Sequence, residues 1–185
     1  MVRARAAALV LLDASPFYRF CEAQLLPSLA EYLRGNARVT PEVTTELRRG
    51  ARSGRHAGLR YLELAGWPPE TAALPAELQR PFLDYSRAAR QKDEPPSKHA
   101  GEIATVLMAA HLGAAAVVID DLFGKRLARD RGVPRLSTAQ LAAEMVAEGQ
   151  LTDDDGYRAF DLSTPTEAGP RDFARACERA RAPRD

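Results

Sequence analysis

The chain has 185 residues, of which 45% are hydrophobic and 28% are charged, a composition typical of a globular domain and not of a disordered chain. The net charge of +1 excludes a protein that is basic over its whole surface, so any surface that binds polyanions must be local. Two cysteines, Cys21 and Cys177, are too few for a disulfide framework or a zinc site, and no apolar stretch is long enough to cross a membrane. We therefore expect a cytoplasmic protein.

The N-terminal segment MVRARAAALVLLD has basic residues before apolar ones, as a signal peptide does. Asp13 cuts the apolar run short, however, and no small-residue cleavage site follows. Residues 6–12 instead predict a buried first strand with Asp13 at its carboxyl end. Ser15 and Pro16 then predict the cap and first turn of a helix, which Pro27 kinks or divides.

A second pair of elements follows, with a short strand over residues 37–39 and a helix that opens at Pro41. Glu42 and Glu46 lie one turn apart on the same face of this helix. The helix dipole accounts for Glu42, which lies in the first turn. Glu46 lies one turn deeper, and we expect it to have a functional role.

Residues 47–62 carry five arginines and no acid before Leu62. Such a run can neutralise phosphates, and its glycines predict a mobile connection in place of one rigid helix. A solvated surface is the alternative interpretation. The next segment, residues 67–97, is rich in proline and charge, which predicts a helical insertion or lid.

Residues 100–113 predict a strong helix with Glu102 in its first turn, where the helix dipole alone would account for an acid. His99 precedes this helix and adjoins Glu102, but its loop position fits a phosphate contact and no role equally well, so we assign it neither. The apolar residues 114–119 then predict a buried strand that ends in two further acids, Asp120 and Asp121.

The C-terminal third predicts structural elements and no site. Residues 133–136 have strand character, and Ser137 with Thr138 predicts a helix start. The acidic triplet at residues 153–155 follows Thr152, so helix capping and solvation explain it better than metal binding. Residues 163–185, with three prolines and five arginines, predict a weakly docked tail helix.

The acids predict the fold and the chemistry together. Two buried strands that end in aspartate indicate an α/β fold with a mostly parallel central sheet, because the carboxyl ends of parallel strands meet at one crevice. Several carboxylates that converge there cannot all stay ionised unless a cation neutralises them. Ligands that are all oxygen select Mg²⁺ or Mn²⁺, which can activate water against a phosphodiester. The sequence therefore predicts nuclease chemistry.

Four segments in order resemble the PIN-domain family, best known as toxin-type ribonucleases. They are LVLLDAS, TPEVTTEL, GEIATVLMA, and VVIDDLFGKRLARDRGV followed by ST. The resemblance covers residues 6–162, apart from residues 67–97. It implies a three-layer α/β/α sandwich with a mostly parallel central sheet, in a nuclease domain over residues 1–162, with residues 163–185 as an arginine- and proline-rich tail.

Carried over to this sequence, the resemblance implies a set of catalytic acids around Mg²⁺ or Mn²⁺. Many members have Thr or Ser two residues before the fourth acid, whereas Ile119 precedes Asp121 here, so the fourth ligand is either Asp120 or Asp121. We expect five catalytic acids, Asp13, Glu46, Glu102, Asp120 and Asp121, of which Asp13, Glu102, Asp120 and Asp121 are the metal ligands. We expect RNA contacts from Arg48, Arg49, Arg52, Arg55, Lys125 and Arg126.

The resemblance also implies partners, namely an RNA substrate, an antitoxin protein if the chain is a toxin, and a second copy in a homodimer. Two alternatives remain. A phosphatase of the haloacid dehalogenase type also begins with a strand ending in Asp, but it requires an acid two residues later, where this chain has Ser15. A PIN-like module that binds RNA or protein without cleavage is the non-enzymatic alternative.

Overall fold

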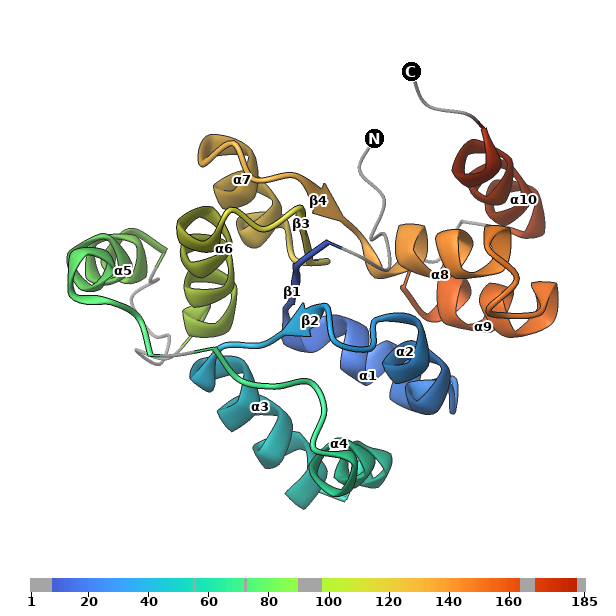
Figure 1. The fold of residues 1–185 in the computed structure, drawn as a ribbon, viewed down its shortest axis with the longest axis horizontal. Coiled ribbons are helices and arrows are strands. Elements are labelled where there is room, and N and C mark those ends of the chain that lie inside the picture. The colour runs from blue at the N-terminus through green and yellow to red at the C-terminus, as the bar shows by residue number, and fades with distance from the viewer. Residues whose placement is uncertain (1–7, 55, 72, 90–97, 164–168, 183–185) are drawn as a thin grey trace.

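A four-stranded parallel sheet lies at the centre of the computed structural model, which describes residues 8–54, 56–71, 73–89, 98–163 and 169–182 (Figure 1). The strand order is β2-β1-β3-β4. The strands are β1 (Val10–Leu12), β2 (Ala37–Arg38), β3 (Ala116–Val118) and β4 (Arg135–Leu136). Leu12 pairs with Val118, and Val118 pairs with Leu136, so these three strands end at the same edge of the sheet. The predicted α/β fold with a parallel sheet is confirmed.

Side chains alternate between the two faces of the sheet, as expected for extended strands. Leu12 and Val118 belong to one cluster of buried side chains, whereas Leu11 and Val117 belong to a second cluster. All four are fully buried because helices pack against both faces. This explains why the strands read as continuous apolar runs in the sequence.

The first cluster is built mainly by six helices. These are α1 (Ala14–Glu22), α2 (Leu26–Tyr32), α3 (Pro41–Arg52), α8 (Thr138–Ala147), α9 (Asp153–Ser163) and α10 (Pro170–Arg181). The short 3-10 helix η1 (Ala57–Leu59) and α4 (Arg60–Ala65) extend it beside α3. The second cluster lies under α6 (Ala100–Leu112) and α7 (Leu122–Asp130), and α5 (Ala76–Ala89) packs against it from outside.

The helix that Pro27 was expected to kink or divide is present as two helices, α1 and α2, with Pro27 at the start of the second. The cap expected at Ser15 is wrong. Asp13 occupies the N-cap position, and the Ser15 hydroxyl donates to Asp13 Oδ2 over 3.1 Å from inside the first turn. The end of β1 and the start of α1 therefore share one residue, the first of the predicted acids.

The first part of the arginine run, up to Arg52, is helical and is not the mobile connection that its glycines predicted. Helix α3 continues through Arg52, and Gly50 lies inside it because the ring of Tyr18 packs where a larger side chain would sit. The turn comes later, at Gly54, whose φ of +79° favours glycine. Arg55 lies outside the described residues.

Two peripheral segments are helical. Helix α5 lies within the predicted insertion, and its Phe82 and Tyr85 pack on the second cluster, while residues 90–97 lie outside the described part of the chain. The predicted tail helix is α10, which buries Phe173 and Cys177 in the main core beside α8 and α9, so it is more than weakly docked. Among the described residues, no helix combines the length and the apolar character needed to span a bilayer.

Candidate metal centre

Asp13 lies at the carboxyl end of β1, in the middle of the sheet. Its backbone N–H donates to the Val118 carbonyl over 3.1 Å, which ties the end of β1 to the end of β3. Only 5% of its surface is exposed, and the Ser15 hydroxyl is a hydrogen-bond donor to its carboxylate. The fold therefore buries a carboxylate at the edge where parallel α/β sheets bind their ligands.

Glu46 approaches Asp13 from α3. The Thr40 hydroxyl caps this helix by accepting from the Val43 N–H. A Cβ on Gly101 would lie 3.5 Å from both Asp13 Oδ1 and Glu46 Oε2, so these two oxygens are at most twice that distance apart. Because Gly101 has no side chain, it leaves open the space between the two carboxylates.

Glu102 extends this group to a second pair of helices. Glu102 lies in the first turn of α6, and a Cβ on Gly124 would lie 3.3 Å from the Cβ of Glu102. The missing side chain at Gly124 thus allows the start of α7 to approach the start of α6. The next acid, Asp121, caps α7, and its Oδ1 accepts from the N–H groups of Phe123 and Gly124 over 2.7 and 3.4 Å.

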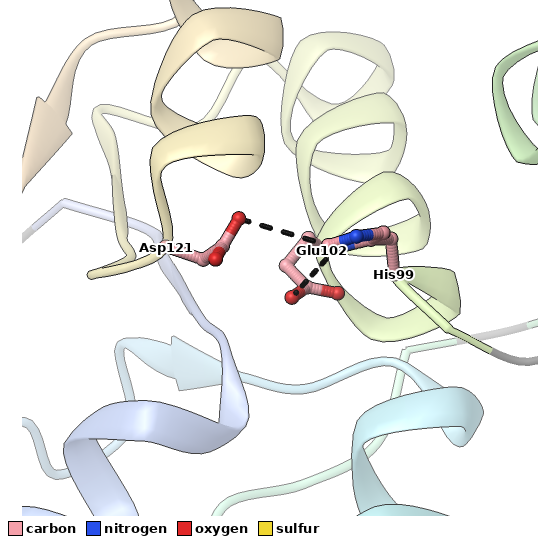
Figure 2. A group of neighbouring side chains, drawn as sticks. All are labelled: His99, Glu102 and Asp121. Atoms are coloured by element: carbon pink, nitrogen blue, oxygen red, sulfur yellow. Dashed lines mark hydrogen bonds and ion pairs between the residues drawn. The ribbon is translucent and has the colours of Figure 1, made fainter. Parts of the chain in front are cut away.

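His99 completes the group, although the sequence pattern predicts no role for it. Its Nδ1 lies 3.4 Å from Glu102 Oε1 and 4.0 Å from Asp121 Oδ1 (Figure 2). One donor atom from each of these three residues lies within 4.8 Å of the other two. The exposed fractions of the three side chains are 16% for His99, 19% for Glu102 and 44% for Asp121, so the group opens to solvent on the Asp121 side. The spacing of three residues between His99 and Glu102 was the available sequence signal.

The two neighbouring aspartates have different surroundings. Asp120 Oδ1 accepts from the Thr138 N–H over 2.8 Å, and Asp120 Oδ2 accepts from the Thr138 hydroxyl over 2.7 Å. Both oxygens of Asp120 are thereby directed at the start of α8. Of the two neighbours, Asp121 is the one whose carboxylate faces Glu102 and His99.

The electrostatics of the group favour bound positive charge. Burial, together with the negative charges of Glu102 and Glu46, raises the pKa of Asp13 to about 7, against the opposing hydrogen bonds from Ala14 and Ser15. Although Glu46 is exposed, partial desolvation of its carboxylate and the charge of Glu102 raise its pKa, while Arg49 lowers it. Glu102 is thus the common neighbour of both acids.

The predicted cationic residues lie on different surfaces. Arg49 lines a groove of about 340 Å³ together with Glu46 and Gly101, beside the acids. Arg48 lies on the other side of α3, where its Nε is 3.6 Å from Glu63 Oε1. Arg52 is exposed near the end of α3, and Lys125 and Arg126 lie on α7, with Arg126 the more exposed. Only Arg49 of the described run both borders the groove and acts on the pKa of a site acid.

Comparison with models of protein families, with curated proteins and with solved structures finds no match to this chain. The function must therefore be inferred from the geometry and chemistry of the site.

Proposed function

We propose that this chain is a metal-dependent ribonuclease that hydrolyses RNA phosphodiester bonds with Mg²⁺ or Mn²⁺. The observation that carries the proposal is the convergence of carboxylates from four separate elements at one edge of a parallel sheet. The carboxylates belong to Asp13, Glu46, Glu102 and Asp121. This arrangement destabilises the ionised form of Asp13, and a divalent cation is the ligand that would relieve the repulsion.

The residues divide into distinct roles under this proposal. Asp13, Glu102 and Asp121 hold the cation, which when bound neutralises charge and lowers the pKa of its water. Glu46 lies exposed at the rim of the groove, where it can orient a water molecule and accept its proton. Asp120 is a positioning residue, because its two bonds to Thr138 fix the chain so that Asp121 faces the other acids.

The family-level part of the proposal rests on the same features. Helices packed on both faces of a parallel sheet fit the three-layer α/β/α sandwich of PIN domains, and the four sequence segments that resemble that family supply the site acids. We extend the proposal to a toxin that acts in the cytoplasm, with an antitoxin as its inhibitory partner. A homodimer belongs to the same family-level proposal.

The test is cleavage of single-stranded RNA by the purified chain in Mn²⁺, in Mg²⁺ and in EDTA. We expect metal-dependent cleavage that Asp13→Asn and Asp121→Asn each abolish. Asp120→Ala should reduce cleavage together with thermal stability, because it removes both oxygens that accept from Thr138. RNA binding without cleavage by the wild type in every metal would instead support a non-catalytic RNA-binding module. Hydrolysis of a phosphate monoester, with RNA left intact, would support a phosphatase.

A further inference from the structure

His99 occupies an unusual backbone position at the rim of the acid group. Its φ is +63°, in the left-handed region, and it directly precedes the first turn of α6. Glycine adopts this conformation readily, whereas it is uncommon for residues with a side chain, among which asparagine, aspartate and histidine adopt it most often. The side chain has no capping hydrogen bond to α6, so helix capping does not account for a histidine at this position.

The imidazole ring is held in one orientation. The ring of Phe123, from the first turn of α7, lies 4.7 Å from it between ring centres, and the side chain of His99 is mostly buried. This packing directs Nδ1 toward the carboxylates of Glu102 and Asp121, as Figure 2 shows. The three side chains come from the starts of two helices that converge because Gly124 lacks a side chain.

The distances also match those between ligands of one cation. Nδ1 forms a long hydrogen bond of 3.4 Å with Glu102 Oε1, whereas Asp121 Oδ1, at 4.0 Å, lies beyond hydrogen-bond distance. Around one octahedral ion with bonds of about 2.1 Å, ligand atoms lie roughly 3 to 4 Å apart. The three donor atoms, all within 4.8 Å of one another, are close to that spacing.

We infer that His99 is a metal ligand through Nδ1, together with Glu102 and Asp121, and that this mixed nitrogen and oxygen set binds Mn²⁺ in preference to Mg²⁺. Mg²⁺ is a hard ion that prefers oxygen and keeps its waters, whereas first-row transition metals accept imidazole readily. The inference deepens the proposed function by naming the metal, and it rests on the metal centre of that proposal. It does not require that RNA be the substrate.

The direct test is the pulsed electron paramagnetic resonance spectrum of Mn²⁺ bound to the full chain, which detects a coordinated ¹⁴N nucleus. We expect a ¹⁴N coupling in the wild type that disappears in His99→Asn. Asparagine tolerates the left-handed backbone, so this variant removes the imidazole without adding backbone strain. His111→Asn is the matched control, because His111 is exposed near the other end of α6.

Calorimetric titration with Mn²⁺ and with Mg²⁺ gives the second readout. Loss of a residue that only hydrogen-bonds to a metal ligand typically weakens metal binding by about 10- to 100-fold. Loss of a direct ligand should cost no less, so His99→Asn should weaken Mn²⁺ binding by at least about tenfold. Mg²⁺ binding should change much less. Equal losses for both ions, or a wild-type Mn²⁺ spectrum without ¹⁴N coupling, would overturn the inference and would show that His99 is only a neighbour of the acids.

The inference and the proposed function can fail separately. A wild-type chain that binds Mn²⁺ through nitrogen but cleaves no RNA would support the histidine ligand and contradict the ribonuclease. A chain that cleaves RNA equally well in Mg²⁺ and Mn²⁺, with both activities unchanged in His99→Asn, would support the ribonuclease and overturn the histidine ligand.

Discussion

Helix α3 separates two hollows of similar volume and different chemistry. On one side, Glu42, Glu46 and Arg49 line the groove of about 340 Å³ beside Gly101. On the other side, a hollow of about 370 Å³ lies between α3, α4 and the segment from Gly66 to Glu70. Buried leucines of α3, η1 and α4 line much of this second hollow.

The comparison shows that volume does not identify the site. In the apolar hollow, the charged residues Arg48 and Glu63 lie close enough to form an ion pair with each other. On the side of the acidic groove, burial and the negative charges of Glu102 and Glu46 raise the pKa of Asp13. Repulsion of this kind does not stabilise the fold, which makes the acidic side of α3 the better candidate for function.

Asp13→Asn should change the pH dependence of stability more strongly than any other substitution on this side of α3. The pKa of Asp13 is about 7 in the folded chain and 3.8 as its ordinary value. The contribution of Asp13 to stability is therefore fully present below about pH 4 and is lost as the pH rises through 7. The reason is that Asp13 ionises at a lower pH in the unfolded chain than in the folded chain. At about 1.4 kcal/mol for each pKa unit, the loss is on the order of 4 kcal/mol. Urea unfolding in EDTA from pH 4 to 8 should show this fall in the wild type.

Asp13→Asn should remove that part of the slope and should be more stable than the wild type at pH 8 without metal. With Mn²⁺ at pH 8, the order should reverse, because ligand binding stabilises only the chain that keeps the ionised carboxylate. Asp154→Asn, a change at an exposed acid on α9, is the matched control. A wild-type melting temperature that does not respond to millimolar Mn²⁺ would refute the metal centre.

Part of this site could be predicted from the sequence. The apolar runs that end at Asp13 and at Asp120 predicted parallel strands, and the fixed geometry of such sheets then placed these acids at one edge. Which of the two neighbouring aspartates faces Glu102 could not be predicted, because Asp120 is turned away by its bonds to Thr138, which lies 18 residues further along the chain. The orientation of His99 depends on a left-handed backbone and on Phe123, neither of which gives a periodic signal.

The arginine run shows a second feature that local sequence patterns could not predict, namely how far α3 extends. Glycine in a helix usually weakens it, so Gly50 and Gly54 together predicted mobility. Gly50 instead fits against Tyr18, which comes from α1, and only Gly54 forms a turn. Tertiary packing therefore overrides the local preference, and Arg48 and Arg49 lie on opposite sides of a continuous helix.

A second substitution, Gly101→Ala, adds a methyl group on the acidic side of α3. Gly101→Ala would place a methyl group 3.5 Å from Asp13 Oδ1 and from Glu46 Oε2, which is ordinary contact. We expect the stability without metal to change little, because the methyl group meets no hard overlap. The rise in melting temperature with Mn²⁺ should decrease strongly, because the methyl group occupies the space between the two carboxylates. An undiminished response to Mn²⁺ would place the cation away from Asp13 and Glu46.

A third substitution, Ala51→Met, places a larger side chain in the hollow on the apolar side of the same helix. Ala51 is buried and borders the hollow that Leu47, Leu59 and Leu62 line. Ala51→Met should stabilise the fold by about 0.5–2 kcal/mol, since cavity filling usually gains that much. Its response to Mn²⁺ should match that of the wild type in thermal melts. A loss of the Mn²⁺ response would show that the two sides of α3 are coupled and would remove the basis of the comparison.

A smaller effect should distinguish two adjacent arginines, Arg48 and Arg49, by their contributions to RNA binding. Arg49 borders the acidic groove, whereas Arg48 lies beside Glu63 on the apolar side, so only Arg49 is placed to contact a phosphate that approaches the acids. Arg49→Gln should weaken the binding of single-stranded RNA at every sequence and should reduce the salt slope of the affinity by about 1. Arg48→Gln should leave both unchanged. Fluorescence anisotropy at several salt concentrations, in an Asp121→Asn background that prevents cleavage, measures the two variants side by side. Equal losses would mean that RNA contacts both sides of α3, and the difference between the two hollows would then not govern RNA binding.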